Sequence, residues 1–288
     1  MTDNESEQSE FDAYLSLADV SEEDHRWAFG TGFGDPLAGI DVAVPAGVDP
    51  AELTATCLAL GDDALIYSHR LQQWVTRAPE LEEETALANI ALDLLGQARL
   101  LLTRAAQAEG GNRDEDRLAF FRDEREFRNV RLVEPADADF AELAARLLLF
   151  SAWRLTVMRG LTAVPANDPG RDPVLAAIAA KAVTELTYHR DYAAAWVIRL
   201  GDGTDYSHAR AQAALDTLWP VAAELGLAGD ADAYLDAVFA EATLRRPDTP
   251  PLAPVAGKTG RDGSHTEAMG YILAELQSVA RANPEATW

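Results

Sequence analysis

The sequence predicts an all-α protein: a four-helix bundle with additional shorter helices toward the C-terminus. Apolar residues recur at helical spacing over four long stretches, and no stretch alternates apolar and polar residues as a half-buried strand does. Turn and cap signals separate these stretches, as expected for a bundle. The chain has 288 residues, 48% of them hydrophobic, which is ample for a sizeable core.

The helix boundaries follow from caps and breakers. Asp49 followed by Pro50 predicts the start of the first long helix, which continues through Trp74. An acidic turn at 82–84 opens the second, and two glycines at 110–111 end it. The other predicted helices cover residues 137–162, 173–200, 205–225, 230–244 and 266–282. A charged segment, 112–136, and a proline-rich loop, 246–263, lie between them.

Charge divides the chain into two predicted parts. Residues 1–50 carry 12 acidic side chains and one basic, a net charge of −11 out of −24 for the whole chain. This composition predicts an acidic N-terminal extension, 1–50, ahead of a helical domain, 51–288. Within the extension, Trp27, Phe29 and Phe33 are candidate docking points.

The acidic balance also bears on partners and habitat. With 48 acidic against 24 basic side chains, the protein should be repelled by nucleic acid and by anionic membranes. Lys181 and Lys258 are the only lysines, and an arginine-rich, carboxylate-rich composition suggests a protein kept soluble in concentrated salt.

Cysteine content and apolar runs predict a cytoplasmic protein. The single cysteine, Cys57, cannot form an internal disulfide, and the N-terminus lacks the basic and apolar regions of a secretory signal. Continuous apolar runs such as 147–153 are far shorter than the roughly 18 residues of a membrane span.

Polar side chains recur at i, i+4 and i+8 within two predicted bundle helices. The second helix, otherwise apolar nearly all round, carries Asn89, Asp93 and Gln97, and the fourth carries Lys181, Glu185 and His189. Such stripes indicate either ordinary surface pairs or an internal polar network at the site where related bundles hold a metal.

The spacing of a di-iron site is missing from these helices. Di-iron carboxylate bundles use Glu-x-x-His on two helices, whereas the one Glu-x-x-His in this chain is Glu22–His25 in the acidic extension. At the corresponding spacing, the second helix offers Leu94 and Gln97. We therefore expect no metal and no catalytic residue here, with Lys181 supplying the positive charge that a metal would supply.

Arginines recur every third residue in the charged segment FFRDEREFRNVRLV, residues 120–133. If the segment is helical, Arg122, Arg125, Arg128 and Arg131 form a slanting cationic row. Arginine forks suit phosphate groups, but the interleaved acids also allow salt bridges within the segment. Both interpretations remain open on the residues alone.

Several long motifs together resemble one known family. These are GDDALIYSHRLQQW (61–74), PELEEETALANIALDLLGQARLLL (79–102), FFRDEREFRNVRLVE (120–134), AKAVTELTYHRDYAAAWVIRLGDGTD (180–205) and GRDGSHTEAMGYILAELQSV (260–279). Over residues 58–288 the chain is similar to the C subunits of ring-1,2-phenylacetyl-CoA epoxidases. The resemblance implies a ferritin-like bundle that acts as the non-catalytic structural partner of a di-iron catalytic subunit of the A type.

The same resemblance implies the rest of the machinery. The complex would insert one oxygen atom of O₂ into the ring of phenylacetyl-CoA, using NADPH through a reductase subunit with flavin and an iron–sulfur centre, and it could include a bridging subunit of the B type. This chain itself would hold no cofactor. Glu126, Phe127, Arg128 and Asn129 would lie at the edge of the pocket near the coenzyme A part of the substrate.

Two alternatives remain. The chain could itself be a di-iron oxygenase or metal-binding protein that uses Asp93, Glu185 and His189, or it could be a stand-alone helical interaction module. Structural roles are expected for the histidines at 69, 208 and 265.

Overall fold

The computed structural model describes residues 37–254 and 257–286, and within these ranges it contains helices and no strand. The α-helices are α2 (Pro50–Gln72), α3 (Leu81–Glu109), α4 (Glu115–Phe120), α5 (Phe140–Ala163), α6 (Pro173–Gly201), α7 (Asp205–Ala222), α8 (Gly229–Glu241) and α9 (Glu267–Ala282). Short 3₁₀ turns are η1 (Val75–Arg77), η2 (Glu124–Glu126), η3 (Arg131–Val133), η4 (Ala223–Leu225) and η5 (Gly260–Asp262).

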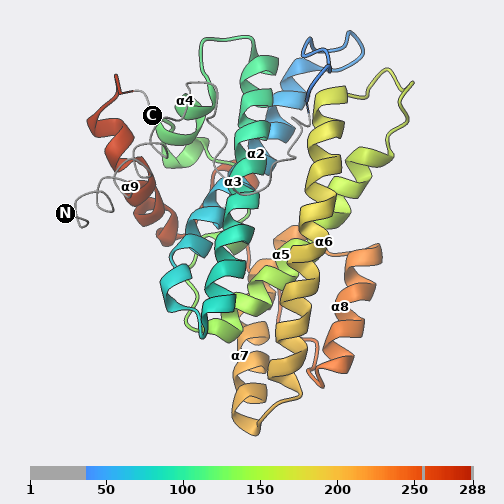
Figure 1. Ribbon diagram of the computed structural model, residues 1–288, viewed down its shortest axis with the longest axis vertical. Helices are drawn as coiled ribbons and strands as arrows, with labels where there is room; N and C mark the ends of the chain where they lie inside the picture. Colours follow the sequence, from blue (N-terminus) through green and yellow to red (C-terminus); the bar gives the residue numbers. More distant parts are fainter. Residues whose placement is uncertain (1–36, 255–256, 287–288) are drawn as a thin grey trace, which may run out of the picture. The chain divides into compact units, whose positions relative to one another are not determined.

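Four long helices form the bundle (Figure 1). Helix α2 packs along α3, α5 packs along α6, and contacts between α3 and α6 join the two pairs. Helices α7 and α8 pack against α5 and α6, whereas α4 and α9 pack together beside α2 and α3. The predicted all-α class and ferritin-like helical bundle are confirmed.

Side-chain caps set the helix starts at the predicted places. Asp49 Oδ1 accepts a hydrogen bond from the amide of Ala51 at 2.9 Å, directly ahead of Pro50. Asp172 does the same for Leu175 at 2.7 Å at the start of α6. Each carboxylate satisfies one of the backbone amides that a first helical turn leaves without a partner. Local chemistry therefore fixes where these bundle helices begin.

The compact unit that contains the bundle begins at Gly39. Residues 39–49, which we predicted to belong to the acidic extension, are part of this unit. The buried side chain of Arg104 on α3 donates from Nη1 to the carbonyl of Val42 at 2.6 Å and also pairs with Asp172. The aromatic docking points predicted at Trp27, Phe29 and Phe33 lie outside the described residues.

Helix α3 is strongly apolar on average, although polar residues interrupt every apolar run in it. By length and composition it could cross a membrane, and 44% of its most apolar 18-residue window is buried here. Its packing against α2 and α6 accounts for the buried part, as in a core helix of a bundle. The remainder of its apolar surface stays accessible in this chain.

Candidate functional site

A fully buried arginine, Arg154 of α5, lies among the bundle helices. Its Nε donates to the amide oxygen of Gln97 on α3 at 3.1 Å, and its Nη1 lies 3.8 Å from the carboxylate of Asp63 on α2. Burial lowers the pKa of Arg154 to about 10, although the charge of Asp63 opposes this effect. A group with that pKa stays protonated at neutral pH, so the bundle interior contains a fixed positive charge.

The polar network extends from Arg154 to α6. The Nε2 of Gln97 donates to Glu185 at 2.9 Å, and Glu185 in turn pairs with Lys181 one helical turn away. Side chains from all four bundle helices therefore form one connected set: Asp63, Gln97, Arg154 and Glu185. Lys181 lies at the partly exposed end of this set.

A second polar contact joins α3 and α6. His189 Nε2 lies 3.0 Å from the carboxylate of Asp93, and the histidine side chain is fully buried. Together with the contact between Gln97 and Glu185, this pair shows that the two predicted stripes face each other. Asn89 is exposed on α3 and Leu94 is buried as an apolar core residue.

Two adjacent buried aspartates anchor distant segments to α2. Asp62 pairs with Arg122 and accepts the amide hydrogen of Arg128 at 2.8 Å. Asp63 pairs with Arg261 at 2.7 Å and accepts the amide hydrogen of Val130 at 2.8 Å. Because both carboxylates are fully buried, these partners supply the charges and donors that burial demands.

The cationic row predicted in the charged segment does not form, because residues 122–134 are 3₁₀ turns and extended backbone rather than one helix. Arg122 is buried against Asp62, and Arg131 is buried against Glu224 at 3.4 Å. Arg125 is exposed. The arginines that stay accessible are therefore Arg125 and, in part, Arg128.

The four residues expected at the coenzyme A edge are in different surroundings. Phe127 is fully buried beneath the guanidinium of Arg122, and Asn129 is fully buried with its Nδ2 donating to Glu134 at 2.9 Å. Glu126 is exposed, and Arg128 is partly exposed with its Nη1 on the carbonyls of residues 125 and 127. In this conformation a ligand can reach Glu126 and Arg128.

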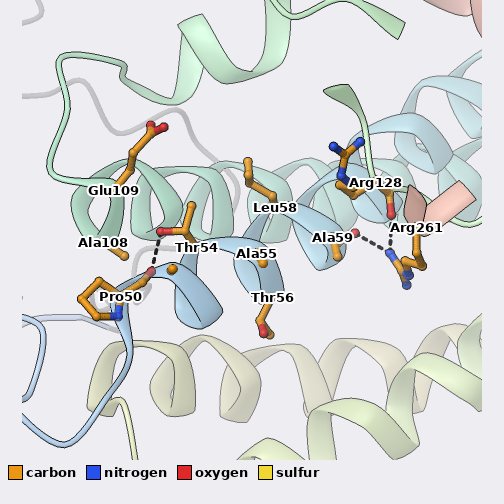
Figure 2. Close-up of a pocket in the computed structure, with 11 residues that line it drawn as sticks. Pro50, Thr54, Ala55, Thr56, Leu58, Ala59, Ala108, Glu109, Arg128 and Arg261 are labelled. Carbon is orange, nitrogen blue, oxygen red and sulfur yellow. Dashed lines mark hydrogen bonds between the residues drawn. The ribbon is translucent and has the colours of Figure 1, made fainter. Parts of the chain in front are cut away.

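Arg128 also lines a groove of about 760 Å³ along α2 (Figure 2). The wall is formed mainly by small and apolar side chains of α2 between Pro50 and Ala59, with Ala108 of α3 beside them. Arg128 and Arg261 lie at one end of the groove and Glu109 lies at the other. The groove thus joins an apolar wall to a cationic end.

The three histidines left without a functional role each have a contact within the chain. His265 lies between the Glu134 carboxylate at 2.7 Å and the carbonyl of Phe127 at 3.1 Å. His208 contacts the carbonyl of Gly201 at 2.7 Å, and His69 lies 3.4 Å from Glu275. These contacts fit the structural roles that we expected.

The sequence profile of the phenylacetic acid catabolic proteins matches residues 44–237 and 227–288, which together make up most of the chain. The chain belongs to this family. It is similar to the C subunit of the 1,2-phenylacetyl-CoA epoxidase of Escherichia coli strain K12, at 43% identity over 258 residues. That match covers 82% of this chain and 99% of the relative, so the two proteins correspond over nearly the whole length of the relative.

A resident di-iron centre does not fit the bundle interior of this family member. Among the described residues, the interior offers an amide, a guanidinium, carboxylates already paired with cations and one histidine, His189, whereas di-iron bundles use four glutamates and two histidines. Within the described ranges, the three potential ligands that lie within 4.8 Å of one another are Glu80, Glu82 and Glu83, at the surface by the start of α3. The Glu22–His25 pair lies outside these ranges.

The cation in the interior is Arg154, whereas we predicted Lys181 for this role. Lys181 does form an ion pair with Glu185, but its side chain is 31% exposed, whereas Arg154 is fully buried. Sequence inspection overlooked Arg154 and Asp63. Two features of the sequence could have indicated them. Arg154 is the one charged residue in the apolar run 147–158, and Asp63 belongs to an aspartate pair inside a largely apolar helix.

Proposed function

We propose that this chain is the non-catalytic structural subunit of a multicomponent phenylacetyl-CoA monooxygenase, which performs ring 1,2-epoxidation in phenylacetate catabolism. It supports the di-iron catalytic subunit of the complex, and the complex is cytoplasmic. A reductase subunit supplies electrons from NADPH through flavin and an iron–sulfur centre, and a bridging subunit is a further candidate partner. The similarity to an epoxidase C subunit supports the choice of complex.

The observation that carries the structural role is the buried Arg154. A guanidinium already supplies positive charge among Asp63, Gln97 and Glu185, so a pair of ferric or ferrous ions there would meet cationic repulsion and too few carboxylate ligands. Gln97 accepts a hydrogen bond from Nε of Arg154 and Asp63 lies 3.8 Å from its Nη1, whereas neither Nη atom has a hydrogen-bond partner among the described residues. Such a chain can present a rigid helical surface without performing oxygen chemistry.

The metal content of the purified full-length chain tests this role. After expression in iron-rich medium, we expect mass spectrometry to find no stoichiometric iron, whereas the coexpressed catalytic subunit should carry about two irons. Stoichiometric iron in this chain would overturn the structural role and favour the alternative of an iron oxygenase. Co-purification of the two coexpressed chains tests the partnership. If this chain is stable and purifies without the catalytic subunit, the partnership is contradicted.

We also propose that Arg128 contacts the coenzyme A part of the substrate at the edge shared with the catalytic subunit. It is partly exposed at the cationic end of the α2 groove, and the hydrogen bonds of its Nη1 go to backbone carbonyls of residues 125 and 127. Arginine binds phosphate through charge-assisted hydrogen bonds.

An Arg128→Ala variant tests that contact, with the exposed neighbour Arg125→Ala as its matched control. Loss of one charge-assisted hydrogen bond should weaken binding of phenylacetyl-CoA to the complex roughly tenfold. Calorimetric titration of the complex measures the affinity. Equal affinity in the two variants would exclude Arg128 from the substrate edge.

A further inference from the structure

Helix α3 carries an uncovered seam of residues at heptad spacing. Leu81, Thr85, Ala88, Leu92, Leu95 and Arg99 follow one another at intervals of four and three residues. Positions spaced in this way share one side of a helix and are the positions at which a second helix packs. None of the six is buried, and Leu81 and Leu92 are 72% and 60% exposed.

Aromatic side chains of α6 continue this surface. The contacts of Asp93 with His189 and of Gln97 with Glu185 set α3 and α6 antiparallel. Leu92 and Tyr188 each precede a residue of the first contact, so they fall on the same side of the helix pair. Tyr188 is 51% exposed, and its ring centroid lies 6.2 Å from that of Tyr192, one turn away. The seam of α3 and these two tyrosines form one continuous surface, which we call the α3–α6 face.

The chemistry of the face is that of a protein interface. Tyrosine is enriched in the buried centre of protein–protein contacts, and an exposed apolar patch such as the one that Leu81 and Leu92 contribute marks an interaction site. At the start of α3 the face is bordered by Glu80, Glu82 and Glu83, three carboxylates close enough to repel one another. A partner that brings basic side chains to this border would relieve that repulsion.

We propose that the α3–α6 face receives a long helix of the catalytic subunit, an inference that rests on the proposed function. The partner helix has apolar residues at heptad spacing and basic residues where it passes Glu80, Glu82 and Glu83. A second copy of this chain is disfavoured, because each copy has a net charge of −24 and two such chains repel each other. An anionic membrane is disfavoured for the same reason.

Charge substitutions on the face test the proposal. The purified catalytic subunit is titrated with the full-length chain and with the variants Leu92→Glu and Tyr188→Glu. Both side chains are exposed, so the variants should keep the circular dichroism spectrum and the unfolding midpoint of the natural chain. A carboxylate in the centre of the contact should weaken binding at least thirtyfold, on the order of a hot-spot loss.

The matched control is Tyr206→Glu, which changes a tyrosine at the start of α7 that is 75% exposed and therefore more accessible than Tyr188, and which should bind as the natural chain does. If the natural chain binds the catalytic subunit, yet the face variants bind equally well, the docking inference fails and the proposed function stands. If the natural chain does not bind this partner, the proposed function itself fails. A homodimer of this chain that Leu92→Glu dissociates would identify a second copy as the occupant and overturn the inference.

Discussion

Arg154 shows how a single residue decides what the bundle interior can hold. It is fully buried, contacts α2 and α3, and is linked through Gln97 to α6. A buried charge needs nearby groups that compensate it, and here the carboxylate of Asp63 and the amide oxygen of Gln97 contribute. The donors around Arg154 differ from the four glutamates and two histidines that a di-iron bundle uses.

Removing this guanidinium should destabilise the fold. In Arg154→Met, Gln97 and Asp63 lose a buried charged partner, so we expect the free energy of unfolding to fall by about 3 kcal/mol, as for breaking other buried ion pairs. Urea unfolding followed by circular dichroism measures the change. Arg159→Met, an exposed position on the same helix, is the control and should stay within about 0.5 kcal/mol. A fully stable Arg154→Met would mean that the interior does not depend on the charge.

The pKa values of His265 and His69 should shift in opposite directions from the ordinary value. Burial alone would lower the pKa of His265, but the hydrogen bond and charge of Glu134 and the Phe127 carbonyl raise it above 6.5. Burial lowers the pKa of His69 below 6.5, and Glu275 only partly opposes this. A ¹³C-resolved NMR titration should therefore show His69 losing its proton at lower pH than His265. The reverse order would contradict the buried ion pair.

The raised pKa of His265 also gives the sign of its contribution to stability. The folded state binds this proton more tightly than the unfolded state, so the contribution is fully present below pH 6.5 and is lost as the pH rises through the higher folded value. Unfolding of the natural chain and of His265→Gln, compared from pH 6 upward, should converge as the pH increases. If the difference in stability between the two proteins grew with pH, the protonated form of His265 would not be the stabilising one.

At the scale of elements, close helix approach depends on particular glycines. A Cβ on Gly201, at the end of α6, would lie 2.3 Å from the carbonyl oxygen of Ala242 after α8. Both groups belong to the backbone, so neither can move aside without shifting a helix end. By contrast, a Cβ on Gly96 in α3 would meet nothing within 4 Å.

These two positions predict opposite effects of the same substitution. Gly201→Ala should destabilise the chain by about 1–3 kcal/mol through overpacking. Gly96→Ala should stabilise it by roughly 0.5–1 kcal/mol, because alanine restricts the unfolded chain and favours the helix. Thermal and urea unfolding of the two variants side by side would measure both effects. Similar changes of one sign would show that α6 and α8 can adjust their contact.

At the scale of the whole molecule, excess negative charge sets the expected response to salt. The net charge is −24, and nearly half of it belongs to residues 1–50. Screening shortens the range of carboxylate repulsion from about 10 Å at 0.1 M salt to about 3 Å at 1 M. We therefore expect the unfolding midpoint of the full chain to rise with KCl, as measured by scanning calorimetry. A midpoint that does not change between about 0.1 and 1 M would argue against adaptation to concentrated salt.

The sequence by itself determined the features that depend on local spacing. Helical periodicity predicted four long helices, and caps such as Asp49 and Asp172 fixed their starts. The i, i+4 spacing also predicted that Asp93 and Gln97 share one side of α3. These properties depend on neighbours within a turn or two, so the order of residues contains them.

Only the tertiary structure decided which charges meet. Arg154 and Gln97 are 57 residues apart, and His189 and Asp93 are 96 apart. The arginines of the 120–133 segment were expected as one row, yet two of them turn inward to Asp62 and Glu224. Burial makes an unpaired charge far more costly than an exposed one, so packing selects the partners after the helices have formed. That selection placed Arg154, rather than Lys181, at the fully buried position among the helices of the bundle.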